Sequence, residues 1–144
     1  MNTGLDKTFG MTFGEATSLL YAGELSFEIE QVGDDKFLKV KPNGFFLQSK
    51  DGKELISDYR IYLTRYDEYE ACESSLRGAF SRIETIDDFE HLVERPTRNV
   101  RSLNIPGIRP TLPGLAADND RKTVTAYFSE DRLVRFLHAK LRST

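Results

Sequence analysis

The stretch that decides the fold is ELSFEIEQVGDDKFLKVKPNGFFLQSKDGKELISDYRIYLT, residues 24–64. At its start Leu25, Phe27 and Ile29 alternate with polar residues, which is the period of a strand with one buried face. Three turn sequences follow: VGDDK (32–36), PNG (42–44) and KDG (50–52). Because glycine, and asparagine before it, accept a positive φ at low cost, these turns connect antiparallel strands. The stretch therefore predicts a four-stranded antiparallel meander.

A short helix is expected just before the meander, in MTFGEATSLLYAG (residues 11–23). Thr12 and Glu15 have the spacing of a capping box, in which each side chain satisfies a backbone N–H. The next apolar residues fall on one helical face, and a glycine is placed to end the helix. The first ten residues show little pattern, so we expect a flexible lead-in, with Met11 as an alternative start.

The middle of the chain is acidic and predicts helices. From Tyr66 to Glu94 there are nine Asp or Glu residues against two arginines. Residues 67–80 have moderate helical character. Residues 85–94 have a stronger pattern, because Thr85 can cap a helix whose apolar residues form one stripe.

The C-terminal part predicts one strand and one helix. TVTAYF (123–128) has the composition of a short strand. Ser129 is placed to cap a helix over 130–142, with acidic residues first and basic residues last, in agreement with the helix dipole. Apolar residues at 133, 136, 137 and 141 would form its buried face.

Residues 95–122 differ in composition from the rest. From Arg95 to Leu115 there are four arginines, four of the five prolines and no acidic residue. Unstructured connections longer than about 12–15 residues are uncommon in compact domains. Because apolar residues are interspersed, we expect an ordered, extended arm on its own domain or on a neighbour. The whole then predicts an α+β fold, one domain over 11–144, with the helix packed on the meander.

The composition restricts the class of protein. A net charge of −3 and a pI near 5.5 give no general attraction to nucleic acid. Cys72 is the only cysteine, so an intramolecular disulfide is excluded. We find no signal-peptide pattern and no apolar run of about 20 residues, so we expect a soluble, cytoplasmic protein without membrane contact.

Residues for catalysis are sparse. His91 and His138 are the only histidines, each in a predicted helix without a sequence-local partner. Carboxylates beside Cys72 disfavour a thiolate, and no glycine-rich phosphate loop is present. We therefore expect a non-enzyme without a cofactor or a metal site.

Binding residues are expected in the arm and at the end of the meander. Arg98, Arg101 and Arg109 can grip phosphate groups with paired hydrogen bonds. They can equally neutralise the acidic segment before them. Tyr62 and Tyr66 can stack on a base or fill a pocket of a partner, or can be ordinary core and rim residues.

The first half of the chain resembles a known family. MTFGEATSLLYAG and FFLQSKDGKELI…YLTRYDEYEAC, within residues 11–73, are similar to segments of the phage Thoeris anti-defence sponge family. The resemblance implies a helix packed on a small antiparallel sheet, assembly into oligomers, and sequestration of cyclic ADP-ribose-type nucleotides without cleavage. The chain lacks the tryptophans typical of that family, so no binding residue is transferred from it.

Two functions are predicted from these observations. The first is a non-catalytic, phage-type anti-defence protein that sequesters a phosphorylated or cyclic nucleotide signal in the host cytoplasm. The alternative is a protein–protein inhibitor or assembly subunit that docks on a partner through the arm of residues 95–122. In both cases we expect a homo-oligomer.

Overall fold

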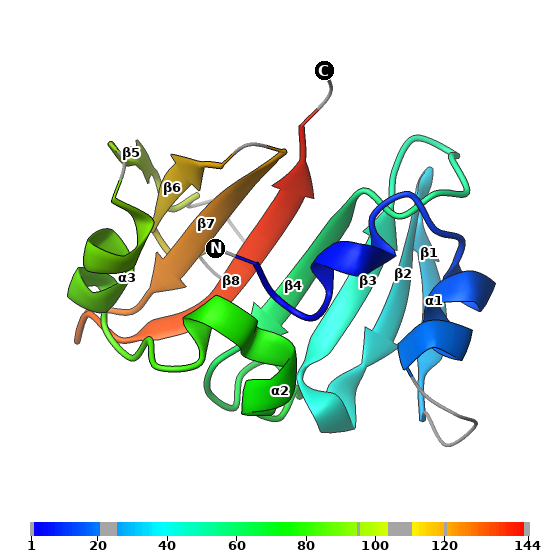
Figure 1. Ribbon diagram of the computed structural model, residues 1–144, viewed down its shortest axis with the longest axis horizontal. Coiled ribbons are helices and arrows are strands. Elements are labelled where there is room, and N and C mark those ends of the chain that lie inside the picture. The colour runs from blue at the N-terminus through cyan, green and yellow to red at the C-terminus, as the bar shows by residue number, and fades with distance from the viewer. Residues whose placement is uncertain (1, 21–25, 95, 104–110, 120, 143–144) are drawn as a thin grey trace.

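The structure is a computed structural model that describes residues 2–20, 26–94, 96–103, 111–119 and 121–142. Its centre is an eight-stranded antiparallel sheet with the strand order β1-β2-β3-β4-β8-β7-β6-β5 (Figure 1). The strands are β1 (Glu28–Val32), β2 (Asp35–Val40), β3 (Phe45–Ser49), β4 (Asp58–Tyr62), β5 (Arg98–Val100), β6 (Gly114–Asp118), β7 (Lys122–Phe128) and β8 (Val134–Leu141).

The helices are short. The α-helices are α1 (Phe13–Leu20), α2 (Ser74–Arg77) and α3 (Ile86–Val93), and the 3₁₀ helices are η1 (Asp6–Thr8), η2 (Lys41–Asn43) and η3 (Gly78–Phe80). The capping box of α1 is confirmed, because the Thr12 N–H donates to Glu15 Oε1 at 3.1 Å and the Glu15 N–H donates to Thr12 Oγ1 at 3.2 Å. The predicted glycine end of α1 lies outside the described residues.

The α+β prediction of a helix on a four-stranded meander is wrong. Strands β1 to β4 pair in chain order, but β4 also pairs with β8, and the sheet continues to β5. The segment predicted as a C-terminal helix, 130–142, contains strand β8. Because β8 is central, apolar side chains on both of its faces are buried, and their combined spacing imitates a helical period.

Ser129 belongs to a turn rather than to a helix cap. The Arg132 N–H donates to the Ser129 carbonyl at 2.8 Å, and the Ser129 N–H donates to the Leu133 carbonyl at 3.1 Å. Arg132 has a positive φ of 67°. These bonds close the β7–β8 hairpin, so the polar cluster that predicted a helix start encodes a tight turn.

The predicted arm of residues 95–122 contains regular structure. Strands β5 and β6 pair with each other, and β6 pairs with β7 along its length. Outside the strands, the Thr111 N–H donates to the Leu103 carbonyl at 3.0 Å, which extends the ladder. A proline- and arginine-rich composition concealed these strands, because β5 is only three residues long and carries exposed arginine.

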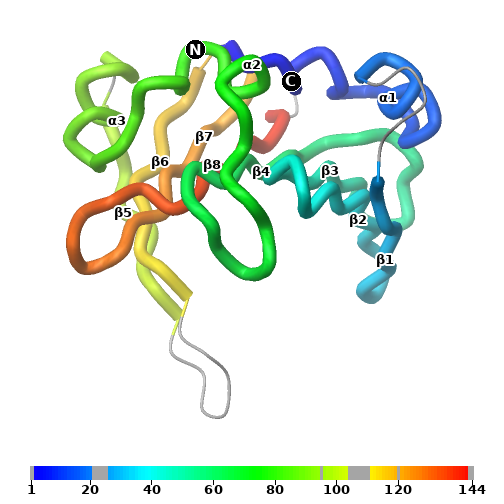
Figure 2. Tube along the Cα trace, turned by 90° about the horizontal axis from the view of Figure 1, so that it is seen from below, coloured from blue at the N-terminus to red at the C-terminus, as the bar shows by residue number. Residues whose placement is uncertain are grey.

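The two faces of the sheet differ. Figure 2 shows the N-terminal segment and all three α-helices on one side. That side holds the main core, which includes Leu38, Phe45, Leu47, Tyr59 and Ile61, each at most 1% exposed. We call the other side the open face, because no helix of the described residues covers it.

The N-terminal segment, predicted as a flexible lead-in, is packed on the main core. Leu5 and Thr8 are fully buried. The Asp6 carboxylate accepts hydrogen bonds from the Lys122 ammonium at 2.7 Å and from the Tyr59 hydroxyl. This contact joins the start of the chain to β4 and β7.

In the described ranges, no helix is long and apolar enough to span a membrane.

Candidate functional site

The open face carries one row of side chains that comes from three strands. The pairing register places Phe46 of β3, Arg60 of β4 and His138 of β8 side by side. Neighbouring side chains on a strand point to opposite faces, so Tyr59 and Ile61 enter the main core while Arg60 stays on the open face. The row therefore places the Arg60 guanidinium between the Phe46 ring and the His138 imidazole.

His138 connects Arg60 to a buried carboxylate. The Arg60 Nε–H donates to His138 Nδ1 at 3.2 Å, and His138 Nε2 lies 2.8 Å from Asp58 Oδ2. Because arginine Nε is always a donor, Nδ1 must be unprotonated, and the ring proton sits on Nε2. Burial lowers the pKa of His138, and the nearby Arg60 charge adds to this. The imidazole is thus held neutral in one orientation.

Asp58 is the buried end of this series of contacts from Arg60 through His138. It is 1% exposed and forms an ion pair with Lys50 Nζ at 2.9 Å. Ser57 Oγ donates to its other oxygen at 2.8 Å. Burial by itself would raise the pKa of Asp58, but the hydrogen bonds from His138 and Lys50 outweigh it and hold the pKa below its usual range.

The Arg60 guanidinium rests on aromatic rings. Its carbon lies 4.3 Å from the ring centre of Phe136, 5.3 Å from that of Phe46 and 5.6 Å from that of Tyr127. Arg60 takes part in none of the ion pairs formed among the described residues. The open face therefore presents a positive charge that is fixed by a neutral imidazole and by cation–π contacts.

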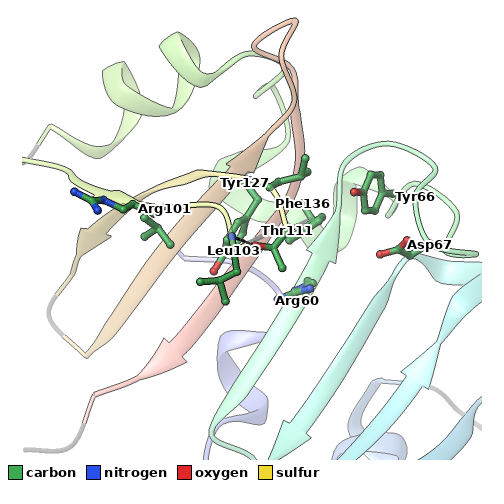
Figure 3. A pocket seen from close by; sticks show the side chains of 10 residues that line it. Arg60, Tyr66, Asp67, Arg101, Leu103, Thr111, Tyr127 and Phe136 are labelled. Atoms are coloured by element: carbon green, nitrogen blue, oxygen red, sulfur yellow. Dashed lines mark hydrogen bonds between the residues drawn. The ribbon is translucent and has the colours of Figure 1, made fainter. Parts of the chain in front are cut away.

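A pocket of about 370 Å³ lies against this guanidinium (Figure 3). It is lined by Arg60, Tyr66, Asp67, Val100, Arg101, Leu103, Thr111, Leu112, Tyr127 and Phe136. The β4–α2 connection supplies Tyr66 and Asp67, and the segments next to β5 and β6 supply the opposite wall. The pocket thus combines mostly apolar walls with a few polar groups, among them the Arg60 guanidinium and the Asp67 carboxylate, as small-molecule sites commonly do.

The structure separates the residues predicted for binding. Tyr66 lines the pocket, whereas Arg101 stands at its rim with its guanidinium turned away from Arg60 (Figure 3). Tyr62 is 3% exposed and stacks on Tyr69 at 4.2 Å. Arg98 forms a two-bond pair with Asp118, at 2.9 and 3.2 Å, and not with the acidic segment 66–94. Arg109 lies outside the described residues.

Sequence reasoning missed the central residue, Arg60. The available signal was its place in DYRIY, where an arginine stands between Tyr59 and Ile61 at a position that faces away from the main core. His138 and Phe136 could not be placed beside it, because residues 130–142 were interpreted as a helix. Asp67 and Tyr127 join the site only through tertiary structure.

The Asp58–His138 pair does not activate a nucleophile. In nucleophilic catalysis the second ring nitrogen would contact a hydroxyl or a thiol, but here it accepts from Arg60. Cys72 is buried, and burial raises the pKa of its thiol to about 12. His91 Nδ1 contacts the Asp87 carbonyl at 2.8 Å. The described His and Cys side chains thus form structural contacts.

Metal ligands are also not gathered in the part of the chain that the structure describes. There, no group of three or more His, Cys, Asp or Glu residues is arranged to hold a metal ion.

No protein family and no curated protein matches the chain. A crystal structure of a DUF4309 family protein (YjgB) from Bacillus subtilis is similar over 91% of this chain and 78% of that chain. Its sequence identity is 14% and its TM-score is 0.47. The resemblance to the Thoeris anti-defence family stays a prediction.

Proposed function

We propose that the protein is a non-catalytic binding protein that takes up a small organic anion, such as a phosphorylated or cyclic nucleotide, on its open face. The observation that supports this most is the Arg60 guanidinium, which lies in a pocket and has a neutral imidazole as its hydrogen-bond partner. A charged guanidinium recognises phosphate or carboxylate through short, charge-assisted hydrogen bonds. The anion would neutralise a cation that pairs with no described carboxylate.

The walls of the pocket suit the rest of such a ligand. Tyr66, Tyr127 and Leu103 offer apolar surface, on which a base or another ring can pack. The polar lining groups, including Thr111, can accept or donate hydrogen bonds. The open face lacks a nucleophile with a free base among the described residues, which supports binding without chemistry. In its biological role, the protein would act against a defence system by sequestering a nucleotide signal in the host cytoplasm.

Isothermal titration calorimetry with 3′,5′-cyclic AMP tests the proposal. In Arg60→Met the apolar stem remains while the charged donors are lost, so affinity should fall about 10- to 100-fold, as for a lost charged hydrogen bond. Arg82→Met is the matched control, because Arg82 is exposed and lines neither pocket of the open face. Absence of binding to the unmodified protein at high micromolar ligand, or equal affinity in both variants, contradicts the proposal.

A second candidate is docking of a protein partner through the predicted arm. It is supported by the exposed side chains of Arg98, Arg101 and Leu103, the last of which is 58% exposed. Replacing the four arginines of the arm by alanine should abolish capture of the partner and leave the circular dichroism spectrum unchanged. Unchanged capture would argue against this candidate.

A further inference from the structure

A second pocket lies on the same open face, on the far side of Arg60. Its volume is about 480 Å³, and it is lined by Glu30, Val32, Phe37, Lys39, Lys41, Phe46, Gln48, Arg60, Tyr62, Asp67, Glu68 and Tyr69. Arg60 and Asp67 line both this pocket and the first one. The two pockets therefore adjoin at the guanidinium, which stands between them.

The two pockets share one aromatic floor. Five ring contacts follow one another from β2 to β7: Phe37–Phe46 at 5.4 Å, Phe46–Tyr69 at 6.2 Å, Tyr69–Tyr62 at 4.2 Å, Tyr62–Phe136 at 5.4 Å and Phe136–Tyr127 at 4.9 Å. Arg60 lies over this floor, closest to Phe136. Ring systems of a ligand can pack on either side of the charge.

Four of the other five charged side chains of the second pocket already form ion pairs, and the fifth, Asp67, also lines the first pocket. Lys39 pairs with Glu30 at 3.0 Å, and Lys41 pairs with Glu28 at 2.9 Å and with Glu68 at 3.0 Å. Arg60 stands outside these pairs. An anionic group is therefore attracted to the Arg60 guanidinium rather than to the paired lysines of the second pocket.

We infer that the two pockets form one site for an elongated ligand whose negative charge lies between two ring-containing ends. A phosphodiester that joins two nucleosides has this chemistry: the diester faces Arg60, and one base enters each pocket. Each pocket alone is within the range of about 300–1,000 Å³ that is common for small-molecule sites. The inference rests on the proposed function, because both use Arg60.

The test compares a ligand with one base and a ligand with two. Calorimetry measures the dissociation constants of 5′-AMP and of adenylyl-(3′→5′)-adenosine. The dinucleotide should bind at least about tenfold more tightly, since base stacking on an aromatic side chain commonly contributes a factor of this size. Phe37→Ala in the second pocket and Tyr66→Ala in the first should each reduce this ratio to below about threefold.

Phe27→Ala is the matched control, because Phe27 is 45% exposed and lines neither of the two pockets; the ratio should stay at the unmodified value. A dinucleotide that binds no more tightly than 5′-AMP, while 5′-AMP binding still depends on Arg60, overturns this inference and leaves the proposed function standing. Binding of neither ligand overturns both. A ratio that Phe37→Ala and Tyr66→Ala leave unchanged also overturns the inference.

Discussion

Asp6→Ala should destabilise the protein through the buried ammonium that it leaves behind. The Lys122 side chain is 4% exposed, and its Nζ lies 2.7 Å from both oxygens of Asp6. Removing one partner of a buried ion pair costs about 3–5 kcal/mol, because the other charge stays desolvated. Asp6 is 23% exposed, so the lower value, about 3 kcal/mol, is expected. For a chain of this size that lowers Tm by roughly 10 °C.

The double variant Asp6→Ala/Lys122→Met separates this cause from lost packing of the N-terminal segment. Methionine keeps the apolar stem of Lys122 and removes the charge, so the double variant should be more stable than Asp6→Ala alone. Urea unfolding followed by circular dichroism gives the free energies of unfolding. A loss below about 1 kcal/mol in Asp6→Ala, or a double variant less stable than the single one, refutes the reasoning.

The same pair predicts a dependence on pH. Burial lowers the pKa of Lys122, and Asp6 opposes that shift. Without Asp6 the pKa of Lys122 in the folded state falls further. Between that lowered pKa and the ordinary lysine pKa, the unfolded state therefore binds more protons than the folded state. Stability then rises with pH in that window. The deficit of Asp6→Ala relative to the unmodified protein should therefore shrink between about pH 8 and pH 10.

Three further predictions follow from the described geometry. Cyclic AMP affinity should be constant above the pKa of His138, which burial places below 6.5, and should fall at lower pH, because a protonated Nδ1 repels Arg60; affinity that is flat from pH 8 to 5 argues against this. Gly44→Ala should lower stability by more than about 2 kcal/mol in urea unfolding, since φ is +72° and a Cβ would lie 2.2 Å from the Glu70 carbonyl oxygen. Gly33→Ala, at φ +62° with no atom within 4 Å, should lose only about 1 kcal/mol, and equal losses would refute the steric account. Asp67→Asn should tighten cyclic AMP binding about two- to fivefold by calorimetry, because a like charge beside the anion is removed and asparagine tolerates the positive φ of 46°; weaker binding would instead give Asp67 a direct role with the ligand.

Local patterns were sufficient for part of the fold. The spacing of Thr12 and Glu15 predicted the capping box of α1, and Thr85 does cap α3, where it accepts from the Asp88 N–H. Glycine at positions 33, 44 and 52 marked real turns, since each has a positive φ. These features depend on residues within a few positions of one another, which a sequence shows directly.

Long-range pairing was not visible in the same way. Strand β8 lies between β4 and β7, and Phe136, Leu137 and Ala139 are buried on two different faces. A strand buried on both sides loses the alternation that identifies it, so residues 130–142 predicted a helix. Strand β5 pairs over only three residues and carries no apolar pattern of its own.

The candidate site could not be predicted, because strand β8 was not predicted. Arg60 contacts Phe46, Phe136 and His138, which come from β3 and β8, and these contacts define the site. The prediction gave weight to arginines that stood out by composition, but Arg98 is paired with Asp118 on the neighbouring strand. A single arginine between two core residues of a strand was the weaker signal in the sequence and the more important one in the fold.

The most direct test of the central claim is a crystal structure of the protein with adenylyl-(3′→5′)-adenosine. The account predicts a phosphate oxygen at hydrogen-bond distance, about 2.7–3.2 Å, from an Arg60 nitrogen, with a base in each adjoining pocket. Phosphate bound instead in the pocket beside Lys7 and Arg121, with the open face unoccupied at saturating ligand, would contradict it.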